Sequence, residues 1–437
     1  MNDATTERVR ASLKKRYFKE KLFRGFGITA IAASLGFLVI LLGSILIKGL
    51  PAFKATYLNV DIALTEEILD ISADATPEEL RGADFSGAIT KALRERFPEV
   101  TKRKQRRQLS GLVSSGAEYA LAEYLAENRD QFGKTVNLWL LADDEVDALI
   151  KRDMDLSLPI RRGKNKNNED ALITRLSEDQ LGWLQTFKDE GDTQVRLANT
   201  FFTNGDSREP EQAGIRAALI GSAYTLLITF VLSFPIAVAA AVYLEEFAPQ
   251  NRWTDLVEVN INNLAAVPSI VFGLLGLAIF INYLSMPRSA PVVGGIVLSL
   301  MTLPTIIISS RAALKAVPPS IREAARGLGA SPVQVVTHHV LPLAMPGILT
   351  GTIIGLAQAL GETAPLLMIG MVAFIVDIPQ SVTDPSTVLP VQVFLWADAP
   401  ERAFTERTSG AILVLLAFLV VMNLTAVLLR KKFERRW

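Results

Sequence analysis

The sequence predicts an all-α polytopic membrane protein with six transmembrane helices and a large, mainly helical (α or α+β) domain inserted between the first two. Three observations predict this fold. Half of the 437 residues are hydrophobic. Five runs of 22 to 29 residues carry no charged side chain, and about 20 apolar residues are enough to cross a bilayer. Residues 49–213, by contrast, hold 30 acidic and 22 basic side chains, which is more than half of all charges.

The six expected spans follow from the charge-free runs in chain order. The first run is too long for the apolar core of a signal peptide, so we expect it to be retained as a helix. A sixth apolar run is interrupted only by Glu362. The runs are residues 25–47, 217–244, 259–287, 289–310, about 340–376 and 408–429.

Positive charge predicts the orientation, because loops rich in Lys and Arg stay in the cytoplasm. The N-terminal segment 1–24, the loop 311–345 and the tail 431–437 are basic and are expected inside; the alternative for the first is a lipid-binding helix. The segments around Arg288 and from 377 to 407 are expected outside the cytoplasm. The basic residues concerned are Arg8, Arg10, Lys14, Lys15, Arg16, Lys19, Lys21, Arg24, Arg311, Lys315, Arg322, Arg326, Arg430, Lys431, Lys432, Arg435 and Arg436.

The same alternation places residues 49–213 outside the cytoplasm, where their number is large enough for a domain. Their net formal charge is 22 − 30 = −8, which does not favour the capture of anions. The basic run 102–107 is interpreted as a solvated face, since nucleic acid is not expected outside the cell membrane. We also expect a helix from Thr76 as N-cap with Pro77 and Glu79, a helix over 115–130 with Tyr119, Leu121, Tyr124 and Leu125 near one face, a strand over 135–142 and a loop over 163–170.

Several chemistries are excluded by composition. The chain has no cysteine and two adjacent histidines, His338 and His339, whose side chains point about 100° apart on a helix. We therefore expect no metal site, no cofactor and no catalytic residue in this chain. The segment from Gly163 does not match the phosphate-binding pattern G-x-x-x-x-G-K-[ST].

The polar segment between the fourth and fifth spans contains two helix-capping patterns. Ser320 and Glu323 fit a capping box that begins a short helix, and Gly329 is expected to end it in the left-handed conformation. Ser331, with Pro332 and Gln334, fits a second helix start. We expect Pro342 and Pro346 to interrupt this second helix before the next span.

This segment resembles the EAA loop of ABC-importer permeases of the MetI-like family. Glu323-Ala324-Ala325, Gly329, Leu341 and Pro342 fall on the conserved spacing of that loop, while His339 stands in place of an aliphatic residue. The resemblance implies that these six residues dock a separate dimeric ATPase, which would bind and hydrolyse ATP. Residues 214–430 would then form the permease domain.

Two further segments, 262–278 and 359–367, are similar to the A-type permeases of phosphate-specific ABC importers. The resemblance covers about residues 210–437 and extends to long variants with an extra N-terminal region. It implies a multi-pass protein of the bacterial inner membrane that contacts lipid. The implied partners are a companion permease chain, the ATPase and an extracytoplasmic phosphate-binding protein.

Glu362 is the residue that most strongly indicates a solute path, because a carboxylate within a membrane span is costly unless it faces protein, water or solute. The alternative is a carboxylate that only ties helices together. Related permeases often carry Arg four residues earlier, where this chain has Gln358. The path candidates are Glu362, Thr363, Gln358, Ser269 and Thr305.

Two other functions remain open from the sequence. The same machinery could carry sulfate, molybdate or phosphonate instead of phosphate. A membrane sensor whose loop docks a regulator is the alternative from a different class. The sequence leaves the role of residues 49–213 undetermined.

Overall fold

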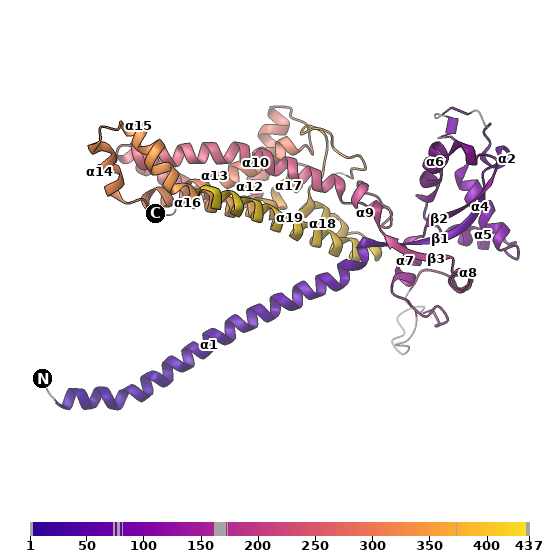
Figure 1. The fold of residues 1–437 in the computed structure, drawn as a ribbon, viewed down its shortest axis with the longest axis horizontal. Coiled ribbons are helices and arrows are strands. Elements are labelled where there is room, and N and C mark those ends of the chain that lie inside the picture. The colour runs from indigo at the N-terminus through magenta and orange to yellow at the C-terminus, as the bar shows by residue number, and fades with distance from the viewer. Residues whose placement is uncertain are drawn as a thin grey trace.

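The computed structural model describes residues 3–72, 75–76, 79–80, 82–160, 172, 174–372 and 374–433. It is an elongated molecule with a helix bundle at one end and a small α+β domain at the other (Figure 1). Five helices are long and apolar enough to cross a membrane, and a bent pair makes a sixth span if it is counted as one. These six segments coincide with the six predicted runs, so the predicted all-helical membrane fold is confirmed. They are α1 (Asp3–Gly49), α10 (Arg216–Val242), α11 (Arg252–Ala265) with α12 (Ser269–Leu275), α13 (Pro291–Lys315), α16 (Leu341–Gly361) and α19 (Ala403–Phe433).

Shorter helices connect these spans. Three of them are π-helical turns, in which wider hydrogen-bonded rings loosen the helix locally. The elements are η3 (π, Tyr243–Phe247), η4 (π, Gly276–Tyr283), α14 (Pro319–Gly327), α15 (Pro332–Gln334), η5 (π, Val335–Val340), α17 (Ala364–Met368) and α18 (Leu389–Ala397).

The first helix diverges from the bundle. The basic segment and the first apolar run form one continuous helix, and the apolar window of α1, like that of α19, is not buried at all within this chain. Figure 1 shows α1 leaving the bundle at the junction with the α+β domain and diverging from it. Its apolar surface therefore needs lipid or another chain to cover it.

The α+β domain is built on a three-stranded antiparallel sheet with the order β2-β1-β3. Residues that alternate along β1, such as Leu58, Val60 and Ile62, are buried under helices, while Asn59 and Asp61 lie on the other face. The elements are η1 (Leu50–Phe53), β1 (Lys54–Ala63), α2 (Glu66–Leu69), α4 (Phe85–Arg96), α5 (Arg103–Ser110), α6 (Ala117–Glu127), η2 (Arg129–Gln131), β2 (Thr135–Leu141), α7 (Asp144–Lys151), α8 (Glu178–Asp189), β3 (Thr193–Leu197) and α9 (Asn199–Thr203).

Local predictions for this domain were partly correct. The strand over 135–142 is confirmed as β2. The predicted N-cap at Thr76 is confirmed, since its hydroxyl accepts from the Glu79 amide at 3.3 Å and the Glu79 carboxylate accepts from the Thr76 amide at 2.7 Å. The expected single continuous helix over 76–97 is wrong, because Asp84 starts a new helix by accepting a hydrogen bond from the Gly87 amide at 2.7 Å. Tyr119 does not join the apolar face of α6, since its side chain is 71% exposed. Pro77 and the loop over 163–170 lie outside the described residues.

A buried ionic cluster joins the domain to the membrane helices. The Lys151 ammonium lies 2.6 Å from the Asp147 carboxylate on the same helix and 2.9 Å from the Glu406 carboxylate on α19. The Lys151 side chain is only 2% exposed. Beside it, the buried guanidinium of Arg407 donates to the carbonyls of Ala52 at 2.9 Å and Glu211 at 3.1 Å.

Glu211 adds an acid to this junction without adding a charge at neutral pH. Burial raises the pKa of its carboxyl to about 8, although a hydrogen bond from Ser114 opposes the shift. The protonated form is therefore favoured in the folded protein at pH 7. Each charged member of the cluster has a partner on another segment, so the domain and α19 are held as one unit.

We predict that Lys151→Met will destabilise this junction by about 3–5 kcal/mol, because it leaves two buried carboxylates without their cation. Thermal unfolding and limited proteolysis of the purified chain in detergent measure the effect. Lys188→Met is the matched control, since Lys188 pairs with Asp153 at the surface of the same domain. Equal stability of the two variants would contradict a supporting role for the buried cluster.

Candidate functional site

The turn after α14 is held by a glycine that no other residue replaces without strain. Gly329 has φ +87°, a conformation that L side chains rarely adopt. Its amide donates to the carbonyl of Arg326 at 2.9 Å, and the Ala330 amide donates to the carbonyl of Ala325 at 3.1 Å. This pair of bonds is a Schellman motif, which satisfies the last carbonyls of a helix. The predicted left-handed glycine is thus confirmed.

The start of α14 differs from the prediction. The helix begins at Pro319, with Pro318 in an extended conformation at the N-cap and no side-chain cap. Ser320 therefore lies inside the first turn, and the expected capping box with Glu323 is wrong. Two successive prolines explain the difference, because they fix the backbone for helix entry and Pro319 needs no hydrogen-bond partner for its nitrogen. Glu323 is left exposed, with no hydrogen bond or ion pair among the described residues.

The second helix starts as predicted but does not stop where predicted. Ser331 and Gln334 form a reciprocal capping box, which confirms that start. The chain then passes through the π turn η5 directly into α16, so one helical segment runs from Pro332 to Gly361. Pro342 and Pro346 do not interrupt it, which corrects the prediction. The wide π turn ends just before Pro342 and gives its ring room against the preceding turn.

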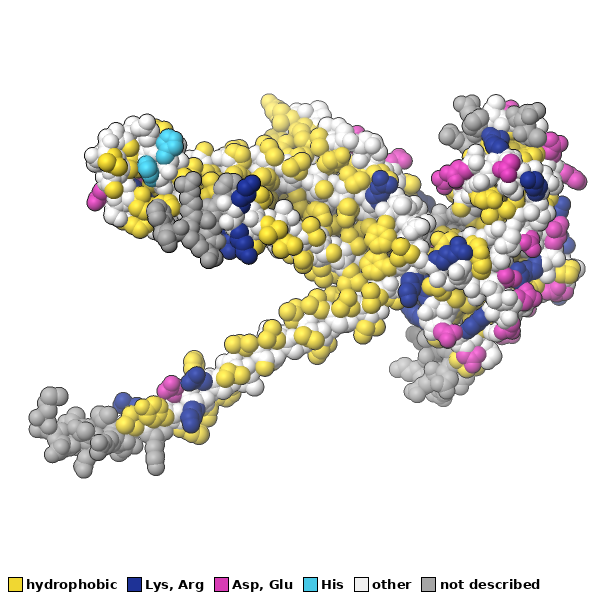
Figure 2. All heavy atoms as spheres, in the orientation of Figure 1, with side chains coloured by type: hydrophobic (Ala, Val, Ile, Leu, Met, Phe, Trp, Pro, Cys, Tyr) yellow, Lys and Arg dark blue, Asp and Glu magenta, His cyan; other side chains and the backbone are white. Residues whose placement is uncertain are grey.

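Only some side chains of the segment from α14 to η5 are exposed to solvent. Ala324 is exposed, whereas Ala325 is buried in the cluster that packs α14 onto the bundle, so only one of the two alanines is available to a partner. Leu328 is 89% exposed and Val333 is 59% exposed. The two histidines are also exposed at this end of the molecule (Figure 2). Among the described residues, no group of three or more possible ligands could hold a metal ion.

Leu341 and Pro342 lie on the inner side of the same segment. Both are half-buried, and Pro342 lines a hollow of about 470 Å³. The hollow lies between the end of α13, the start of α14 and the start of α16. Its walls are Ala313, Ala316, Val317, Pro318, Ile321, Pro342, Leu343 and Pro346.

A charge network fixes α14 to the bundle, and the sequence analysis did not find it. The Arg322 guanidinium lies 2.6 Å from the Glu246 carboxylate. The Arg311 guanidinium is 2.6 Å from the Glu258 carboxylate and 3.4 Å from that of Glu245. The acidic pair Glu245-Glu246 after α10 and the basic residues at the end of α13 were a sequence signal for this network.

Two helix breaks each lead into a short helix, α12 or α17, and these two helices pack on each other. Helix α16 ends at Gly361, and Glu362 leaves the helix in an extended conformation before α17 begins. Helices α11 and α12 are bent by 101° at a break of three residues that ends with Pro268. The Cβ of any side chain at Gly273 would lie 2.6 Å from the Pro365 backbone, so α12 and α17 pack as closely as a glycine allows.

The contacts of these two helices also give their relative direction. Gly273 faces Pro365 and Met368, and Gly276, one turn later, faces Ile369. The helices therefore run parallel. Their starts, Ser269 and Thr363, lie toward the same end of the pair.

The five predicted path residues are not all brought together. Glu362, Thr363 and Ser269 are half-buried at the two breaks. Gln358 is exposed on α16, one turn before Glu362. Thr305 faces Gly355, with its methyl group 3.8 Å from the position of a Cβ there, and Gly355 precedes Glu362 by seven residues, or about 10 Å along a helix. Thr305 thus lies nearer the α14 end.

Other polar residues in the spans satisfy their own helices. Thr229 donates to the carbonyl of Thr225 at 2.8 Å, and Thr302 donates to that of Ser299 at 3.1 Å. This is the ordinary behaviour of hydroxyls in membrane helices. The hydroxyls of Thr225 and Ser233 are exceptions, since both are buried and have no hydrogen-bond partner in the part of the chain that the structure describes.

Comparisons with known proteins agree with this architecture. Residues 233–437 match the family described as "Binding-protein-dependent transport system inner membrane component", and residues 10–160 match a domain of unknown function. The phosphate transport system permease protein PstA 1 of Mycobacterium tuberculosis is 33% identical over 230 residues, which are 52% of this chain and 74% of that protein. The probable ABC transporter permease YqgI of Bacillus subtilis is 34% identical over 39% of this chain and 58% of its own length.

Solved structures give a weaker likeness. A structure of the MetNI methionine ABC transporter is 20% identical, covers 50% of this chain and 97% of its own, and has a TM-score of 0.41. The identity and coverage of the curated relatives are sufficient, and the chain belongs to the family of binding-protein-dependent transport system inner membrane components, the permeases that include the PstA proteins.

Proposed function

We propose that this chain is one of two permease chains of an ATP-driven importer that moves inorganic phosphate into the cytoplasm. The observation that carries the transport role is the segment from α14 to η5. An exposed Glu323 and Ala324 are followed by a left-handed Gly329 at the spacing of an ATPase-docking loop. The phosphate assignment is supported by relatives that are named phosphate transport system permeases.

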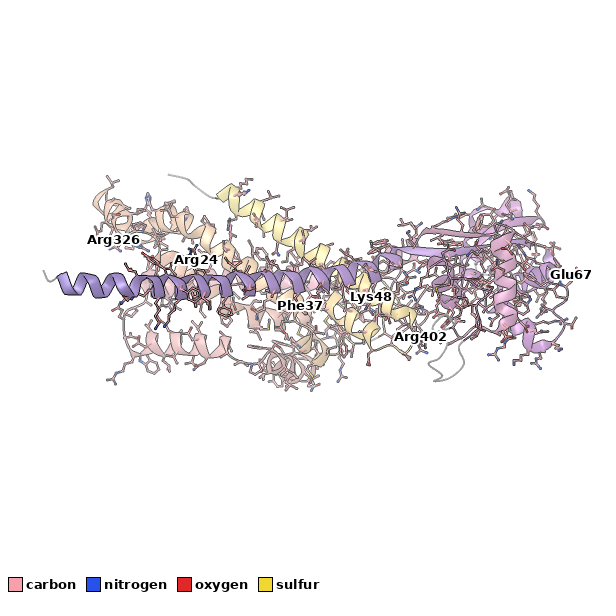
Figure 3. All side chains as sticks on the ribbon, turned by 90° about the horizontal axis from the view of Figure 1, so that it is seen from below. Arg24, Phe37, Lys48, Glu67, Arg326 and Arg402 are labelled. Carbon is pink, nitrogen blue, oxygen red and sulfur yellow. The ribbon has the colours of Figure 1, made fainter. Side chains whose placement is uncertain are left out.

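The orientation follows from charge. We propose that both termini and α14 lie in the cytoplasm, where basic residues are retained, and that the α+β domain lies outside the cell membrane. Figure 3 supports this separation, since Arg326 and Glu67 are at opposite ends of the molecule and Lys48 and Arg402 lie at the junction between bundle and domain.

The expected partners follow from what the chain contains. We expect a separate dimeric ATPase to bind ATP, because this chain carries no phosphate-binding loop in its sequence. An extracytoplasmic phosphate-binding protein would deliver the ion, and a companion permease chain would complete the path. The unburied apolar surface of α1 is available for that chain or for lipid.

The two helix breaks supply the proposed solute path. Breaks in membrane helices free backbone groups and are tolerated where they line a cavity or are covered by protein. Glu362 cannot attract an anion, but its carboxylate is able to accept a hydrogen bond from monobasic phosphate. Ser269 and Thr363 add hydroxyls at the same breaks. ATP binding to the ATPase would favour one conformation of the permease pair, and α14 would carry that bias to the spans.

Uptake of radiolabelled solutes by cells that lack this chain tests the proposal. We expect phosphate uptake to fall to background and to return when the chain is supplied, whereas sulfate, molybdate and phosphonate uptake should not change. Unchanged phosphate uptake with loss of another solute would reassign the solute. Unchanged uptake of every solute, together with altered gene expression, would favour the sensor.

We also predict that Gly329→Ala will reduce ATP-driven uptake. A left-handed alanine costs about 1–2 kcal/mol, so the native turn should become about 5- to 30-fold less favoured. Gly327→Ala is the control, because Gly327 lies in the helix with φ in the ordinary range and open space around its Cβ position. Transport rates and ATPase co-purification measure both variants. A docking role for this turn predicts that only Gly329→Ala is impaired, and equal activity of the two would contradict it.

A further inference from the structure

We propose that Arg322 is the positioning residue that transmits movement of α14 to α10 and α13, and that Glu246 is its essential partner. The inference rests on the proposed function, because it assigns the route by which the ATPase would act on the spans. It goes beyond that function by naming the contact that carries the movement.

The Arg322 side chain joins its own helix to two other elements. Its Nη2 lies 2.6 Å from Oε1 of Glu246, and its Nε is 3.2 Å from both oxygens of the same carboxylate. Its Nη1 donates to the carbonyl of Val317 at 2.7 Å, and its Nη2 donates to that of Leu314 at 2.9 Å. One guanidinium thus joins α14 to the π turn at the end of α10 and to the end of α13.

This arrangement is chemically favourable. Carbonyls at the end of a helix lack partners within the helix and carry partial negative charge, so a cation there is stabilised. A bidentate bond between guanidinium and carboxylate is also stronger and more directional than a single ion pair. The side chains of Arg322 and Glu246 are 17% and 7% exposed, so water screens the pair little.

One face of α14 contacts the bundle, and the opposite face is exposed. Ile321, Arg322 and Ala325 lie within about 100° of one another around the helix, and all three contact the bundle. Glu323, Ala324 and Arg326 are exposed. A force applied to the exposed face would therefore reach the bundle through the apolar contacts and the Arg322 pair.

The neighbouring pairs extend the same connection. Arg311 joins α13 to the π turn through Glu245 and to α11 through Glu258, and the Lys315 ammonium lies 3.7 Å from Glu245. Helix α11 leads to the break before α12. The contacts thus form a continuous series from α14 to the proposed solute path.

The test compares substitutions in the complete transporter in proteoliposomes, with the ATPase, the companion chain and the binding protein present. We expect Arg322→Gln and Glu246→Gln to retain the ATPase and its basal ATP hydrolysis but to import at least tenfold less solute per ATP. Arg322→Lys should give an intermediate loss, because an ammonium keeps the charge but not the planar fork. The double variant Arg322→Gln/Glu246→Gln should lose no more than Arg322→Gln alone, because the two act through one contact.

Arg252→Gln is the matched control, since it removes the same charge from an exposed arginine at the start of α11, outside the segment from α14 to η5, and no ion pair of Arg252 is found among the described residues. It should import the normal amount of solute per ATP. A ratio for Arg322→Gln within twofold of the natural protein, or equal losses for Arg322→Gln and Arg252→Gln, would overturn the proposal. If Arg322→Gln fails to assemble, the ratio measured for Glu246→Gln decides.

Failure of the proposed function gives a different result. In that case the unsubstituted transporter itself does not import phosphate. If it imports another solute, the same ratio is measured with that solute, and the proposal for Arg322 stands or falls on it.

Discussion

The hydrocarbon core of the membrane is the constraint on which the rest of this structure depends. Backbone groups have no water there, so the chain crosses as helices and leaves the helical conformation only where protein or solvent can meet the freed groups. Both internal breaks obey this rule, since the turn at Glu362 and the turn before Ser269 lead into two short helices that pack on each other through Gly273. The same rule confines formal charge in the spans to the two ends of the bundle and to Glu362.

The two ends of the bundle use charge in the same physical way. At one end, Lys151 lies between acids of the α+β domain and of α19. At the other, Arg322 joins α14 to α10 and α13. In both places a long basic side chain reaches a carboxylate on another element, which is costly to break because its partner would be left partly buried and unpaired. The spans are thus connected to the α+β domain at one end and to α14 at the other, and α19 contacts α16, the helix that follows η5.

The features predicted best from the sequence are those that depend on local chemistry. Charge-free runs predicted the spans, and the φ of Gly329 and the Ser331–Gln334 cap followed from turn and capping rules. The predictions of helix ends were wrong where adjacent residues favour different helix starts or stops. Ser320 and Pro319 both suited a helix start, and the helix begins at Pro319. A π turn that ends at Val340 gives room to Pro342, and the helix also continues through Pro346. The contact of Lys151 with Glu406 had no signal in local spacing, because only the fold brings these distant segments together.

We propose above all that a separate ATPase covers the segment from α14 to η5. Cysteine labelling tests this directly, because the natural chain has no cysteine. Ala324→Cys and Ala325→Cys differ by one position but lie on opposite sides of the boundary between exposed and buried residues. A water-soluble thiol reagent should label Ala324→Cys quickly in the free chain and slowly once the ATPase is bound, whereas Ala325→Cys should be protected in both states. Equal labelling of Ala324→Cys with and without the bound ATPase would contradict the account.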